Sequence, residues 1–268
     1  MSNLDRTLAR PGATLRFAML DGDRRPVVLV HGAGMDHSMF DAQALALQVA
    51  GHAVVAFDQR GHGGSRLEPG TRFTGPAALD DLAALLDHLA LERPALVGHS
   101  LGGNVAQALV RRDPGRTGAL IVIDSTWNTG PLSRSERAAL RLAAPALSLI
   151  PASRLPGMLA RASAITPEAI AATEAMFARM PKRSFLDVWR ATVAFVDPDP
   201  DYRVPVHLGL IRGELDRTGN IATAMPAWAS AEGVGERVIA GAGHVVTLDA
   251  PEATTTTLLD LLASVPHV

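Results

Sequence analysis

Residues 94–103 read PALVGHSLGG, a short apolar run followed by a glycine-rich turn. The apolar run predicts a buried strand, and the helical spacing of apolar residues after the turn continues to about Arg112. A serine on a sharp strand-to-helix turn is held in a strained backbone conformation with its hydroxyl exposed. Gly98 and Gly102 let neighbouring backbone come close to that turn. We therefore predict that Ser100 is a catalytic nucleophile.

Short apolar runs alternate with helical stretches on both sides of this turn. The alternation is typical of an α/β fold with a mostly parallel sheet and helices on both faces. The predicted strands cover residues 26–30, 53–57, 94–97, 120–123, 204–211 and 237–239. The predicted helices cover residues 76–91, a stretch ending near 112, and 251–263. Residues capable of chemistry follow the C-terminal ends of the strands, where open α/β sheets bind ligands, so we expect the site there.

Residues 126–200 differ from the flanking sequence because they carry helical periodicity, eight prolines and little strand pattern. We interpret them as a helical cap inserted into a core domain formed by residues 1–125 and 201–268. The turn-rich segment 197–200 ends the cap. The larger apolar side chains of the cap either pack it onto the sheet or line an apolar substrate pocket. They are Met158, Met176, Phe177, Met180, Phe185, Trp189 and Phe195.

A serine hydroxyl is a poor nucleophile unless a base accepts its proton, and an acid orients that base. His244 is the best candidate base because it follows the last predicted strand in the glycine-rich sequence GAGH. For the acid we favour Asp216, at the end of GELD after the penultimate strand, because the chain order Ser, Asp, His is that of the triad on such sheets. Asp124, which ends an earlier strand, is the alternative, and Glu214 is a third candidate.

The oxyanion hole is expected to use two backbone N–H groups. Leu101 supplies one because it directly follows the nucleophile, and Ala33 supplies the other from the loop HGAG at residues 31–34. The alternative interpretation of this loop is a plain glycine turn. Another glycine-rich loop, DQRGHGGS at residues 58–65, lacks the Lys-Ser/Thr ending of a P-loop and the spacing of a dinucleotide fingerprint. We interpret that loop as structural.

Together these segments resemble the α/β-hydrolase superfamily, specifically its cap-bearing branch of esterases, enol-lactonases and cofactor-free haloperoxidases. The matching motifs are HGAG, DQRGHGGS, GHSLGG, GELD and GAGH, which span residues 26–251 in the expected order. The resemblance implies an eight-stranded, mostly parallel sheet, a Ser–His–Asp triad and a two-step acyl-enzyme mechanism. It also implies that the reaction needs no cofactor, and we expect no metal.

Two positions depart from the pattern of many relatives. Ala33 is small where many carry a bulky or aromatic residue, which predicts a wider acyl pocket, and Asp249 stands where relatives often have Glu. The nucleophile position holds a serine rather than an aspartate, which argues against haloalkane dehalogenase or epoxide hydrolase chemistry.

The composition excludes several classes of protein. The 268 residues include no cysteine, which excludes a disulfide framework, a thiolate metal site and a cysteine nucleophile. The 25 basic and 27 acidic residues are interspersed and give a formal net charge of −2, so we expect no nucleic-acid or membrane partner. Residues 1–10 include three charges and no apolar core, unlike a signal peptide. We expect a cytoplasmic protein, monomeric or homodimeric.

The sequence as a whole predicts a serine hydrolase that cleaves a small carboxylic ester or lactone. Carbon–carbon bond hydrolases, thioesterases, acyltransferases and perhydrolases use the same fold and triad, so these alternatives stay open. A small-molecule receptor that retains the triad is an alternative of another class. The residues expected to contact the acyl substrate are Gly32, Gly34, His99, Trp127, Met158, Trp189 and Val245.

Overall fold

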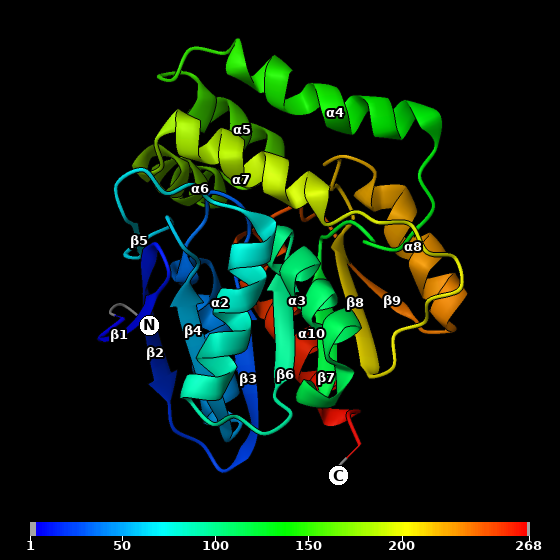
Figure 1. Ribbon diagram of the computed structural model, residues 1–268. Helices are drawn as coiled ribbons and strands as arrows, with labels where there is room; N and C mark the ends of the chain where they lie inside the picture. Colours follow the sequence, from blue (N-terminus) through cyan, green and yellow to red (C-terminus); the bar gives the residue numbers. More distant parts are fainter. Residues whose placement is uncertain (1–3, 267–268) are drawn as a thin grey trace.

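The computed structural model describes residues 4–266, in which helices cover both faces of a sheet (Figure 1). Eight strands follow the order β1-β2-β4-β3-β6-β7-β8-β9, and the two-residue β5 pairs with β2. The pairs formed by β2 are antiparallel, whereas those from β4 to β9 are parallel, which confirms the predicted mostly parallel eight-stranded sheet. The strands are β1 (Arg6–Arg10), β2 (Ala13–Leu20), β3 (Arg24–Val30), β4 (His52–Asp58), β5 (Arg66–Leu67), β6 (Ala95–His99), β7 (Ala119–Ile123), β8 (His207–Gly213) and β9 (Glu236–Ile239).

The central strands are apolar almost throughout because each of their faces packs against helices. In β3, Val28 and Val30 contribute to a core with α2, α3 and α8, while Val27 and Leu29 contribute to a core with α1 and α10. The helices are α1 (Asp41–Val49), α2 (Gly75–His88), α3 (Leu101–Arg112), α4 (Arg134–Ser148), α5 (Leu155–Ser163), α6 (Pro167–Arg179), α7 (Lys182–Ala194), α8 (Ile221–Glu232), α9 (Val246–Asp249) and α10 (Pro251–Ala263). Since β3, β6, β7 and β8 run parallel as neighbours, their C-terminal ends meet at one edge of the sheet.

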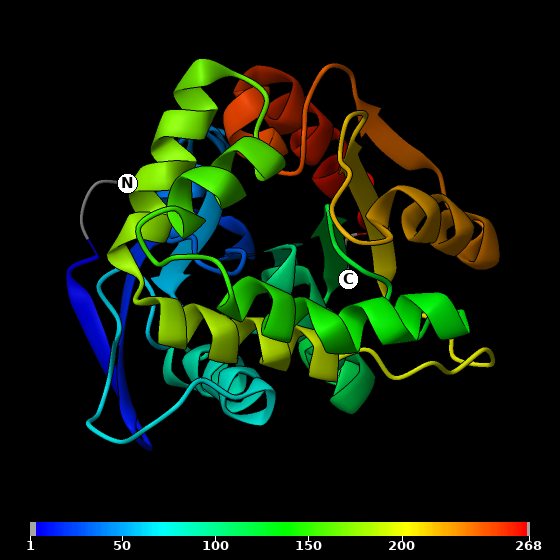
Figure 2. The same ribbon diagram turned by 90° about the horizontal axis from the view of Figure 1, so that it is seen from above.

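Helices α4–α7 form an insertion between β7 and β8 and lie beyond the C-terminal edge of the sheet (Figure 1). Viewed from above, α4 and α7 run alongside each other across that edge (Figure 2). Two ion pairs join the insertion to loops of the sheet. Arg72 donates to Asp187 of α7 at 2.9 Å, and Arg179 of α6 donates to the buried Asp36 at 2.7 Å.

Several helices begin at residues whose side chains cap them. Thr74 accepts a hydrogen bond from a backbone N–H in the first turn of α2, and Thr166 does the same for α6. Ser133 and Glu136 form a capping box at the start of α4, in which each side chain receives a backbone N–H. Among residues 4–266, no helix combines the length and the apolar character needed to cross a bilayer.

Candidate active site

Ser100 lies on the turn between β6 and α3, at the C-terminal edge of the sheet. Its φ of 51° and ψ of −118° place a non-glycine residue in a sparsely populated region, which costs on the order of 1–3 kcal/mol. The Ser100 N–H donates to the Ile123 carbonyl at 3.0 Å, and the Ser125 hydroxyl donates to the Ser100 carbonyl at 2.8 Å. Bonds from the neighbouring strand and its following loop therefore hold the strained turn in place.

The glycines around Ser100 are required by close backbone contacts. A Cβ at Gly102 would overlap the Val30 carbonyl oxygen and lie 2.7 Å from the His31 oxygen. A Cβ at Gly98 would lie 2.5 Å from the Gly102 oxygen. The first turn of α3 therefore lies directly against the end of β3, which brings the turn that carries Ser100 and the loop after β3 together.

His244 and Asp216 form a hydrogen-bonded pair at the ends of β8 and β9. His244 Nδ1 lies 3.0 Å from Asp216 Oδ2, and the Thr218 N–H donates to the other carboxylate oxygen at 2.7 Å. Both side chains are buried. Burial by itself would raise the pKa of Asp216, but the charge and hydrogen bond of His244, together with Thr218, lower it to about 2. Asp216 is therefore ionised and fixes Nδ1 of His244 as the protonated nitrogen, which leaves Nε2 free to accept a proton.

Ser100 and His244 line the same cavity, whose volume is about 240 Å³. The insertion contributes much of its apolar wall through Phe177, Phe185 and Trp189. The sequence analysis predicted Trp189 as a substrate contact and named Phe177 and Phe185 only as part of a larger apolar set. Asn104, one turn after Ser100, also lines the cavity, and the sequence analysis did not identify it.

The two predicted oxyanion donors come from the first turn of α3 and from the loop after β3. Leu101 is the first residue of α3, and N–H groups in the first turn of a helix have no partner within that helix. Ala33 lines the cavity in the loop that Met35 closes through its N–H bond to the Gly32 carbonyl. Within the described part of the chain, the Ala33 N–H donates to no acceptor. Both groups are available for an anion.

The cavity brings together only some of the residues predicted to contact substrate. His99 and Trp189 line it. The others are absent from its lining within residues 4–266: Trp127 stacks on Trp228 with ring centroids 5.9 Å apart, Met158 is 37% exposed, and Val245 is fully buried in the core. Gly32 and Gly34 are also outside the lining and instead leave space for the rings of His99 and Phe177.

His99 supports the loop that carries His244. Its Nε2 lies 2.8 Å from the His244 carbonyl oxygen, so Nε2 is the protonated nitrogen of a neutral ring. Burial is the largest cause that lowers the pKa of His99 to about 3, and the neighbouring His244 adds to it. His99 therefore stays neutral at physiological pH, and its hydrogen bond holds the backbone of the loop that carries His244.

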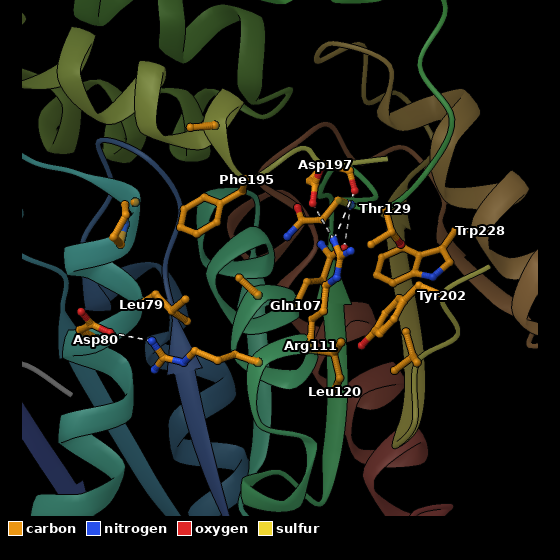
Figure 3. A pocket seen from close by; sticks show the side chains of 17 residues that line it. Leu79, Asp80, Gln107, Arg111, Leu120, Thr129, Phe195, Asp197, Tyr202 and Trp228 are labelled. Carbon is orange, nitrogen blue, oxygen red and sulfur yellow. Dashed lines mark hydrogen bonds and ion pairs between the residues drawn. The ribbon is translucent and has the colours of Figure 1, made fainter. Parts of the chain in front are cut away.

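A larger cavity of about 440 Å³ is lined in part by side chains of an amide network, among them Gln107 (Figure 3). In this network Asn104 donates to Asn128 at 2.6 Å, and Gln107 donates to the Thr126 carbonyl at 2.9 Å. Three aromatic side chains, Phe195, Tyr202 and Trp228, line the larger cavity. Ser100 lines the smaller of these two cavities and is not among the lining residues of the larger one.

Among residues 4–266, one cluster of three side chains could hold a metal ion: Asp124, Asp216 and His244, whose candidate ligand atoms lie within 4.8 Å of one another. His244 Nδ1 and Asp216 already bond to each other, and Asp124 Oδ1 accepts the Gly213 N–H at 2.8 Å. A cation would have to break the His244–Asp216 bond, which disfavours a resident metal at this place.

Comparisons with known proteins place the chain among hydrolases. A family model described as Alpha/beta hydrolase family matches residues 27–256. A non-heme chloroperoxidase of Streptomyces lividans is 36% identical over 104 residues, which cover 38% of this chain and 37% of that protein. The chain spans about two fifths of the length of the curated relatives it matches.

Solved structures resemble the whole described chain. A thermophilic esterase from Thermogutta terrifontis has a TM-score of 0.78 and 28% identity, with 97% of each chain covered. The enol-lactonase from Burkholderia xenovorans LB400 has a TM-score of 0.80 at 22% identity and covers 97% of this chain and 100% of its own. At that identity the second likeness shows the fold alone.

Proposed function

Because the chain belongs to the alpha/beta hydrolase family, we propose that it hydrolyses small carboxylic esters or lactones with Ser100, His244 and Asp216 as its catalytic triad. One observation carries the proposal: His244, bonded to the ionised Asp216, lines the same cavity as the strained Ser100. The esterase of Thermogutta terrifontis supports the reaction class, since its likeness extends over 97% of the chain.

In the first half-reaction, His244 Nε2 takes the proton of the Ser100 hydroxyl as its oxygen attacks the carbonyl carbon. The carbonyl oxygen becomes an oxyanion, which the N–H groups of Leu101 and Ala33 stabilise. Asp216 holds the imidazole in the required tautomer and stabilises the imidazolium. The imidazolium then protonates the leaving alcohol, and the acyl group remains on Ser100.

In the second half-reaction, water replaces the alcohol. His244 takes a proton from the water as it attacks the acyl-enzyme, and the same two N–H groups stabilise the second oxyanion. Collapse of this intermediate returns the proton to Ser100 and releases the acid. Substrate and water are the only reactants besides the chain that the two steps need in order to balance.

We assign residues 126–200 the role of a cap over the core formed by residues 1–125 and 201–268. Phe177, Phe185 and Trp189 of the cap line the catalytic cavity, which favours an apolar acyl or alkyl group. The cavity volume of about 240 Å³ is below the range of roughly 300–1,000 Å³ that is usual for drug-sized ligands. The substrate is therefore small.

Labelling with a fluorophosphonate, combined with turnover of p-nitrophenyl acetate, tests the proposal. We expect one label per chain, on Ser100, and multiple turnovers. Ser100→Ala should abolish both, whereas the control Ser230→Ala, at an exposed position of α8, should change neither. Labelling on another residue would refute the nucleophile assignment. Labelling of Ser100 without multiple turnover would favour the small-molecule receptor.

A further inference from the structure

Asp124 is a buried carboxyl group that the proposed reaction does not use. It follows β7 with a φ of 43° and has no exposed surface. Its backbone N–H donates to the Ile211 carbonyl at 2.9 Å, and its Oδ1 accepts the Gly213 N–H at 2.8 Å. Its other oxygen, Oδ2, has no hydrogen-bond partner among the described residues, although it is completely buried. An unsatisfied buried oxygen in a native structure calls for a physical explanation.

The surroundings of Asp124 explain which of two carboxyl groups carries charge. Asp124, Asp216 and His244 present polar atoms within 4.8 Å of one another. Two carboxylates this close in a buried place do not both ionise. Asp216 has the donors that a carboxylate needs, the His244 ring and the Thr218 N–H. Asp124 has only one backbone N–H, so it is the carboxyl that keeps its proton.

The other charged groups near Asp124 do not alter this result. Burial is the largest cause that raises the pKa of Asp124 well above its usual range, and the charge of Asp216 is the second. Arg212 acts in the opposite direction. Its guanidinium is already paired with Glu236 at 2.9 Å, which reduces its effect on Asp124.

We propose that Asp124 is held as a neutral carboxylic acid whose Oδ2–H donates a hydrogen bond to Asp216. This inference rests on the proposed function only where it concerns catalysis. Asp124 is then a positioning residue: it fixes the Asp216 carboxylate, and Asp216 in turn orients His244. Its Oδ1 holds the end of β8 through Gly213. Asp124 Oδ2 then carries a proton, and the Asp216 carboxylate accepts the hydrogen bond from it.

Infrared spectroscopy tests the protonation state without any substrate. The wild-type protein at neutral pH should show the carbonyl stretch of a protonated carboxylic acid, shifted in heavy water, and Asp124→Asn should lack it. The control Asp21→Asn, at an exposed loop position, should retain the band. Absence of the band from the wild type, or its persistence in Asp124→Asn, would overturn the proposal whether or not the protein hydrolyses esters.

Kinetics test the positioning role. Asparagine keeps an acceptor for the Gly213 N–H and an N–H donor for Asp216, so Asp124→Asn should retain kcat within about threefold of wild type. Asp124→Val has neither, and we expect kcat to fall about tenfold or more with KM little changed. Should Asp124→Asn lose as much kcat as Asp216→Asn, Asp124 would be a charged member of the triad and the inference would be wrong. If Asp124→Val changed KM and left kcat unchanged, the inference would also be wrong.

Discussion

Replacing Gly102 by alanine tests the oxyanion hole without touching any reacting side chain. A Cβ at this position would overlap the Val30 carbonyl oxygen and lie 2.5 Å from the Val30 carbonyl carbon. Both are backbone atoms at the end of β3, so no side-chain rotation relieves the overlap. An ordinary contact begins at 3.4 Å, so relieving the contact with the Val30 carbon alone requires α3 and β3 to separate by about 0.9 Å, and the overlap with the Val30 oxygen requires more.

This separation displaces the two proposed donors from each other, because Leu101 begins α3 and Ala33 follows β3. A misplacement of about 1 Å costs roughly 100-fold in rate, and loss of one donor costs about 100- to 1,000-fold. We therefore expect kcat to fall roughly 100-fold or more. The overlap costs about 1–3 kcal/mol or more, and the better helix propensity of alanine offsets up to about 1 kcal/mol. The melting temperature should fall by several degrees, at about 2–4 °C per kcal/mol.

The assay is steady-state hydrolysis of p-nitrophenyl acetate, with thermal melting followed by circular dichroism. Gly235→Ala is the matched control because a Cβ there meets nothing within 4 Å and the position is exposed. That variant should match the wild type in both measurements. If Gly102→Ala were folded and kept kcat within about threefold of wild type, Leu101 and Ala33 would not be the donors.

Three more predictions concern stability and selectivity. Burial lowers the pKa of His62 and His99 to about 3, so the unfolded chain takes up protons below pH 6.5 that the folded chain does not. Stability should hold above pH 7 and fall as pH drops from 6.5 towards 3; a urea midpoint independent of pH would contradict this. Asp81→Asn leaves the buried Arg60 without its pair at 2.7 Å and should cost about 3–5 kcal/mol in chemical denaturation. The exposed pair Arg112–Asp80 is the control, and Asp80→Asn should cost at most about 1 kcal/mol. With a cavity of about 240 Å³, kcat/KM should fall from butyrate to decanoate p-nitrophenyl esters, and equal values would rule out a size limit.

The sequence predicted the parallel part of the fold because strands buried on both faces are continuous apolar runs. The predicted strand 120–123 corresponds to β7 (Ala119–Ile123), and the predicted helix 251–263 has the bounds of α10. The N-terminal strands β1 and β2 were missed. They pair antiparallel with each other at one side of the sheet. Arg6 and Arg10 interrupt β1, and the exposed Thr14 and Arg16 interrupt the first half of β2, so the apolar runs in this region are short.

The candidate site was predictable only where a local motif carried it. Ser100 and His244 lie in glycine-rich turns whose pattern can be read without a structure. The closeness of Asp124 to Asp216 depends on β7 and β8 being neighbours, although 89 residues separate Asp124 from Gly213. Trp127, expected at the substrate, instead stacks on Trp228, because a single tryptophan in a loop gives no direction for its ring.

The residues that line the cavity come from separate segments of the chain, and this arrangement affects how the protein can change over evolutionary time. The groups proposed for chemistry come from loops at the ends of strands, whereas the apolar wall comes from helices inserted at one point of the chain, between β7 and β8. Duplication and divergence can therefore change the apolar wall of the cavity while leaving the proposed catalytic groups in place. Proteins that descend from one such gene can therefore differ widely in substrate and still share a single reaction.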